Sequence, residues 1–125
     1  MNIEKTAHWV RLELAGEIDL NWREANAAEL TQLLETCPPV VIIDVENVTF
    51  IDSMGLGVVA LCYQKCRDRA GTLYVTNPQP IVVKAMEAVG LSRFVQVVDS
   101  CESARLMYKH LATFNGAASD LSASA

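Results

Sequence analysis

The N-terminal part of the chain alternates between apolar and charged positions. From Val10 to Leu14 every second residue is apolar, which is the period of two expected for a strand with one buried face. We expect this strand to break at Gly16. Residues 17–20 then predict a second, short extended piece before the pattern changes.

The following segment has the periodicity of an amphipathic helix. The pattern predicts a helix from about Trp22 to Thr36, which ends before Pro38 and Pro39 because proline lacks a backbone donor and restricts the residue before it. The predicted apolar face consists of Trp22, Ala25, Leu30, Leu33 and Leu34.

An almost unbroken apolar run comes next, from Val40 to Val45. Such a run is typical of a strand that is buried on both faces near the centre of a sheet. After a connection over residues 46–52, we expect a helix from Ser53 to Arg69 that Gly71 stops in a left-handed conformation. A short strand over residues 73–75 would complete a βαβ unit.

The last third continues the alternation of helices and strands. Pro78 and Pro80 suit the first turn of a helix that runs to about Val89 and ends at Gly90. A strand over residues 94–98 and a helix from Ser100 to Phe114 should follow. The prediction is a single α/β domain over residues 1–114, with a mixed, mostly parallel sheet of four to five strands and about four helices. Residues 115–125 are small and polar and should be a disordered tail.

Composition and charge exclude several classes of protein. The chain has 125 residues, of which 51% are hydrophobic and 20% charged, so it suits one folded domain and not a disordered chain. The net charge is −5 and there is no run of Lys or Arg, which argues against nucleic acid or a membrane surface as a partner. No apolar stretch approaches the roughly 20 residues of a membrane span, and no signal peptide is evident. We therefore expect a cytoplasmic protein.

The spacing of the cysteines does not indicate a metal site or a disulfide. Cys62 and Cys66 share a helix face, but Cys37 and Cys101 do not complete a metal-binding or disulfide spacing. We interpret the cysteines as reduced, with no metal and no cofactor.

A serine hydrolase is also disfavoured. Ile51 stands where a nucleophile elbow around Ser53 would have its first glycine, and the histidines are His8 and His110. Both histidines are better explained as surface residues.

The most informative segment runs from Phe50 to Gly57. It places Ser53 at the start of a helix just after a buried strand, the edge at which open α/β sheets bind ligands. The simplest interpretation is that Ser53 or Asp52 only caps the helix. However, Gly55 and Gly57 each cost up to roughly 1 kcal/mol in a helix relative to Ala. They indicate a close approach, either by a neighbouring strand or by another protein.

Modification of the serine is compatible with this position. A phosphate on Ser53 would meet the positive end of the helix dipole and free N–H donors of the first turn. The surface would change while the fold is retained.

Residues 50–57 resemble the signature of STAS domains, a family of bacterial anti-sigma factor antagonists. Gly16-Glu17-Ile18-Asp19 is similar to the element before the family's first helix. Val89-Gly90-Leu91, with Phe94, is similar to its step into the last strand. The resemblance extends from about Val10 to Phe114.

This resemblance implies a non-enzymatic, phosphorylation-controlled partner switch. In its unphosphorylated form the protein would bind a GHKL-type serine kinase that is also an anti-sigma factor, and so release a sigma factor. Phosphorylation would break the complex, and a PP2C-type phosphatase would restore it. By position, Ser53 is the phosphoacceptor.

The resemblance also suggests which residues surround the acceptor. Asp19 and Asp52 match acidic positions of the family motifs and are assigned supporting roles. With Ser53, Met54 and the two residues that follow, Gly55 and Leu56, they form the expected partner-binding surface. Met54 replaces a small residue and could tune partner choice. The alternative is a constitutive subunit of a transport or signalling assembly, in which Ser53 is never phosphorylated.

Overall fold

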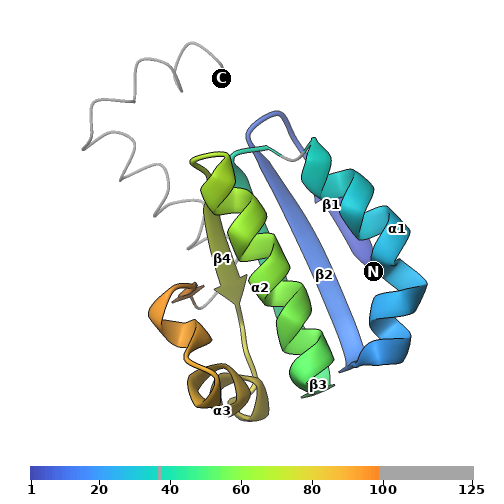
Figure 1. Ribbon diagram of the computed structural model, residues 1–125, viewed down its shortest axis with the longest axis vertical. Coiled ribbons are helices and arrows are strands. Elements are labelled where there is room, and N and C mark those ends of the chain that lie inside the picture. Colours follow the sequence, from blue (N-terminus) through green and yellow to red (C-terminus); the bar gives the residue numbers. More distant parts are fainter. Residues whose placement is uncertain (37, 99–125) are drawn as a thin grey trace.

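The structure, a computed structural model, describes residues 1–36 and 38–98. In this part of the chain, five strands alternate with three α-helices and one 3-10 helix (Figure 1). The strands are β1 (Asn2–Lys5), β2 (Trp9–Ile18), β3 (Val40–Ile51), β4 (Thr72–Thr76) and β5 (Gln96–Val98). The helices are α1 (Leu20–Glu35), α2 (Ser53–Asp68), α3 (Pro80–Ala88) and the 3-10 helix η1 (Leu91–Arg93).

The strands form one sheet in the order β1-β2-β3-β4-β5. β1 is antiparallel to β2, and the other pairings are parallel. This arrangement confirms the predicted mixed, mostly parallel sheet with the Val40–Val45 run at its centre. Helices α1 and α2 lie next to each other over the same face of the sheet (Figure 1).

Both faces of the central strand are buried. Val41 and Ile43 pack with apolar residues of α1 and α2 in the larger of two core clusters. On the other face, Ile42 and Tyr74 are fully buried in a smaller cluster. Burial on both faces explains why β3 has an apolar run instead of an alternating pattern.

Two predicted strand ends are wrong, and both strands are longer than expected. β2 does not break at Gly16 but continues to Ile18, with register shifts on either side of Ala15 and Gly16. Gly16 has a φ of 76°, so it forms an irregularity within the strand and does not end it. β3 likewise continues to Ile51 through the predicted connection, because its second half pairs with the end of β2.

The ends of α2 and α3 illustrate two uses of glycine. The left-handed residue after α2 is Ala70, with a φ of 55°, and not Gly71 as predicted. Gly71 is required for space, since a Cβ there would lie 2.5 Å from the carbonyl oxygen of Pro39. The prediction is confirmed at Gly90, which has a φ of 77°, and Pro80 is the first residue of α3.

Other expectations differ in detail. α1 begins at Leu20, two residues earlier than predicted, and Ala25 on its expected apolar face is exposed. β5 covers only residues 96–98, whereas Phe94 is 62% exposed and its ring lies 6.0 Å from that of Tyr63 on α2. The helix expected from residue 100 and the tail over 115–125 lie outside the described residues.

Candidate functional site

The ends of β2 and β3 bring two acidic residues to the same edge of the sheet. Ile18 and Ile51 are partners in the parallel register, and Asp19 and Asp52 directly follow them. The backbone N–H of Asp52 donates to the carbonyl oxygen of Ile18 over 3.4 Å. The two aspartates are 33 positions apart in the sequence, but the sheet register makes them neighbours in space.

Each aspartate is the N-cap of a helix. Asp19 Oδ1 accepts the Trp22 N–H at 3.0 Å and caps α1. Asp52 Oδ1 accepts the N–H groups of Met54 at 2.9 Å and Gly55 at 3.1 Å and caps α2. Of the two capping candidates in the motif, the aspartate therefore caps α2. The expectation of free N–H donors is wrong for Met54 and Gly55, because Asp52 occupies both groups.

Ser53 is the first residue of α2, and its side chain is exposed. None of the hydrogen bonds found within residues 1–36 and 38–98 involves its hydroxyl group. Met54 is half-buried beside it, whereas Gly55 and Leu56 are buried. The predicted partner-binding segment thus begins at the surface and turns into the core within one helical turn.

The close approach predicted from the two glycines comes from the protein's own elements. A Cβ on Gly55 would lie 2.1 Å from the Ile18 carbonyl oxygen and 2.7 Å from Cγ1 of Ile51. At Gly55 the neighbouring strand is therefore the reason for glycine. At Gly57 the neighbour is a side chain, because a Cβ there would lie 3.0 Å from Nη1 of Arg23.

Arg23 was not identified from the sequence. It is the one basic residue in α1, and its half-buried side chain crosses to the first turns of α2. Its spacing from the aspartate motif carries no recognisable pattern. Only the packing of α1 on α2 reveals that it lies against Gly57, four residues after Ser53.

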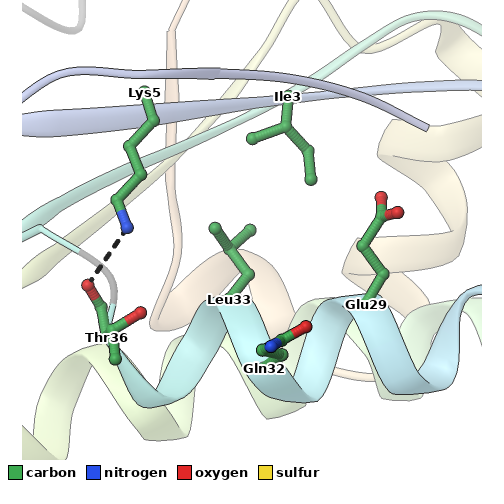
Figure 2. Close-up of a pocket in the computed structure, with 6 residues that line it drawn as sticks. All are labelled: Ile3, Lys5, Glu29, Gln32, Leu33 and Thr36. Carbon is green, nitrogen blue, oxygen red and sulfur yellow. Dashed lines mark hydrogen bonds between the residues drawn. The ribbon is translucent and has the colours of Figure 1, made fainter.

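A shallow pocket of about 340 Å³ lies between β1 and the C-terminal half of α1 (Figure 2). It is lined by Ile3, Lys5, Glu29, Gln32, Leu33 and Thr36. Lys5 Nζ spans it to the carbonyl oxygen of Thr36 at 3.5 Å (Figure 2). None of the predicted site residues lines this pocket, so we assign no function to it.

The family model for the STAS domain matches residues 1–104. The chain belongs to the STAS domain family. The predicted resemblance and the predicted fold class are both confirmed. Among the residues that the structure describes, no helix is long and apolar enough to cross a membrane.

Similar proteins include a curated relative and several solved structures. The Mycobacterium tuberculosis protein named "Putative anti-anti-sigma factor Rv2638" is 29% identical over 92 residues, which are 74% of this chain. The match spans 61% of that relative's length.

Two solved structures illustrate the range of the fold. The unphosphorylated form of the anti-sigma factor antagonist SpoIIAA has a TM-score of 0.69 and 25% identity, over 92% of this chain and 96% of that one. A sulfate transporter family protein from Wolinella succinogenes also has a TM-score of 0.69, with 18% identity over 84% of this chain and 91% of that one. The second likeness concerns the fold alone.

Proposed function

We propose that this STAS domain is a phosphorylation-controlled anti-sigma factor antagonist and that Ser53 is its phosphoacceptor. The observation that carries the proposal is that the N-cap of α2 is Asp52 and not Ser53. Asp52 caps the helix, and the exposed hydroxyl of Ser53 has no hydrogen-bonding role within the described residues. The hydroxyl can therefore be modified without removing a contact that holds the fold.

The proposed partner is a GHKL-type serine kinase that also acts as an anti-sigma factor. When it binds the unphosphorylated domain, it would release its sigma factor. In the reverse step Ser53 Oγ attacks the γ-phosphorus of the kinase-bound ATP, the bond to the bridging oxygen breaks, and ADP leaves. The hydroxyl proton passes to a base of the kinase. A PP2C-type phosphatase would hydrolyse the phosphoserine and return the free hydroxyl and inorganic phosphate.

Electrostatics explain why phosphorylation would break the complex. A phosphate adds about −1.5 to −2 charges at neutral pH. It would be added to a sheet edge that already carries Asp19 and Asp52, in a chain whose net charge is −5. Burying such a group in an interface costs desolvation energy and repels acidic groups of the partner.

The test uses the full chain and the GHKL-type kinase encoded by the same genome. With Mg-ATP the wild type should gain one phosphoryl group, which peptide mapping locates at Ser53. Calorimetric titration without ATP should show that Ser53→Ala binds the kinase like the wild type, and that Ser53→Asp binds at least about tenfold more weakly. Ser92, an exposed serine of η1, provides matched control variants that should bind normally.

The same measurements test the alternative of a constitutive subunit. Its fold is also found in the sulfate transporter family protein. Equal kinase affinity for Ser53→Ala and Ser53→Asp, together with an unchanged intact mass in the native host, would reject the switch and favour the constitutive role.

A further inference from the structure

We propose that Arg23 is the built-in counter-cation for a phosphate on Ser53, so that a residue of α1 holds the phosphorylated first turn of α2. This inference rests on the proposed phosphorylation of Ser53. It adds a residue that neither the motif nor its spacing identifies, and it follows from the packing of α1 on α2.

The spacing along α2 places the serine on the same helix face as the glycine that lies under the arginine. Ser53 and Gly57 are four residues apart in α2 and therefore lie on the same face. Side chains with this spacing are separated by roughly 5–6 Å at Cβ. Arg23 Nη1 lies 3.0 Å from the Cβ position of Gly57, which brings the guanidinium within reach of a phosphate that extends from Ser53.

The direction of helical side chains places the guanidinium over the first turn of α2, while the same tilt at Ser53 leaves the separation of the two Cβ positions unchanged. A Cα–Cβ bond in a helix tilts toward the N-terminus, so a side chain covers the turn that precedes its own Cα. The space left open by Gly57 therefore lies over the turn that begins at Ser53. The Arg23 guanidinium reaches into this space, with Nη1 as the atom nearest to the Cβ position.

Arg23 has no acidic partner among residues 1–36 and 38–98. The salt bridges found within residues 1–36 and 38–98 are those of Arg11, with Glu13 and with Asp44. Within the same residues the hydrogen bond of Arg23 comes from its backbone, whose N–H donates to the Asp19 carbonyl oxygen at 2.9 Å. Its guanidinium group is therefore available to an added anion.

The need for such a cation follows from the neighbouring carboxylate. Asp52 already uses Oδ1 to accept the Met54 and Gly55 N–H groups, so a phosphate on Ser53 cannot rely on these donors. It would instead lie beside the Asp52 carboxylate, which is also negatively charged. A planar guanidinium can donate two parallel hydrogen bonds to phosphate oxygens and offset this repulsion.

The test installs phosphoserine at position 53 of the full chain by nonsense suppression, and needs neither kinase nor partner. A ³¹P NMR titration then measures the second pKa of the phosphate, which is about 6 without a nearby cation. We expect Arg23→Gln to raise this pKa by about half a unit or more, because removal of a positive charge disfavours the dianion. Arg23→Lys should largely retain the wild-type value.

Arg67, an exposed residue in the last turn of α2, gives the matched control, and Arg67→Gln should leave the titration unchanged. A second measurement needs no substitution: the Nε–H resonance of Arg23 should shift between the serine and phosphoserine forms of the wild type. An unchanged ³¹P titration in folded Arg23→Gln, or an unshifted Arg23 Nε–H signal, would overturn the proposal. The kinase assay can fail while this titration succeeds, and the reverse, so the two proposals are tested separately.

Discussion

The carbonyl oxygen of Ile18 occupies the space that a side chain on Gly55 would need. A Cβ on Gly55 would lie only 2.1 Å from this oxygen, which also accepts the Asp52 N–H at 3.4 Å. The carbonyl group of Ile18, the last residue of β2, therefore binds the backbone of Asp52 and requires glycine at position 55. The glycine permits α2 to start directly against β2, and this contact leaves Ser53 at the exposed edge.

The two motif glycines should respond oppositely to alanine. Alanine is favoured over glycine in a helix by about 1 kcal/mol, but at Gly55 the new Cβ would collide with backbone. We expect Gly55→Ala to lower the free energy of unfolding by about 2 kcal/mol or more. Gly57→Ala meets only the flexible end of Arg23 and should be neutral or stabilising by up to about 1 kcal/mol.

Urea denaturation of the two variants measures this difference. Because both substitutions add the same methyl group two positions apart in one helix, each serves as the control for the other. Similar stabilities for the two variants would show that the Ile18 contact does not determine the need for glycine at position 55.

Removal of the Asp52 N-cap should lower the free energy of unfolding. The size of this effect should depend on whether the new side chain keeps an oxygen that can accept the N–H groups of α2. Asp52→Ala removes an acceptor of two N–H groups, and we expect a loss of about 1–2 kcal/mol. Asp52→Asn keeps an oxygen acceptor and should lose less than half of that amount. If Asn is as destabilising as Ala in thermal and urea unfolding, the capping hydrogen bonds are not the cause.

Substitutions of Ser53 itself should leave the fold intact. Its side chain is exposed and its hydroxyl is not the cap, so Ser53→Ala and Ser53→Asp should each change the unfolding free energy by no more than about 0.5 kcal/mol. Circular dichroism and urea titration check this. A strongly destabilised Ser53→Asp would mean that weak kinase binding by that variant reports unfolding instead of repulsion.

The ion pairs of Arg11 should differ in strength according to burial. Arg11 Nη2 lies 2.5 Å from Oδ2 of Asp44, whose side chain is 4% exposed, and 2.8 Å from Oε2 of Glu13, whose side chain is 28% exposed. Asp44 Oδ1 also accepts the Glu46 N–H at 3.1 Å. We expect Asp44→Ala to cost about 2 kcal/mol, and Glu13→Ala less than about 1 kcal/mol.

Denaturation at low and at high salt distinguishes the two pairs. The smaller effect of Glu13→Ala should shrink further in salt, because exposed pairs are screened. The effect of Asp44→Ala should persist. The reverse order of costs would indicate that the buried carboxylate contributes little to the stability of the sheet.

Local patterns in the sequence identified most of the scaffold. The apolar run from Val40 predicts the central strand because a strand buried on both faces has no polar side. Pro80 and Gly90 bound α3 through backbone preferences that act within a few residues. These predictions succeeded because their physical causes are local.

The strand ends could not be predicted in the same way. Gly16 is a residue type that often ends a strand, yet β2 continues because β3 supplies hydrogen-bonding partners as far as Ile18. Gly71 is needed for space beside the Pro39 carbonyl and not for a left-handed conformation, which Ala70 adopts instead. In each case a residue distant in sequence decides the role of the glycine.

The candidate site likewise has some features that local sequence predicts and others that only tertiary packing decides. Short segments of sequence were enough to predict the central strand, the three helices α1 to α3, the STAS motif and the serine that follows Asp52, but they did not predict β1 (Asn2–Lys5) at the edge of the sheet. Three-dimensional packing was needed to show that Asp19 and Asp52 cap neighbouring helices, that Gly55 makes room for Ile18, and that Arg23 lies over Gly57. These relationships arise from strand register and helix packing, which bring together residues that no local pattern connects.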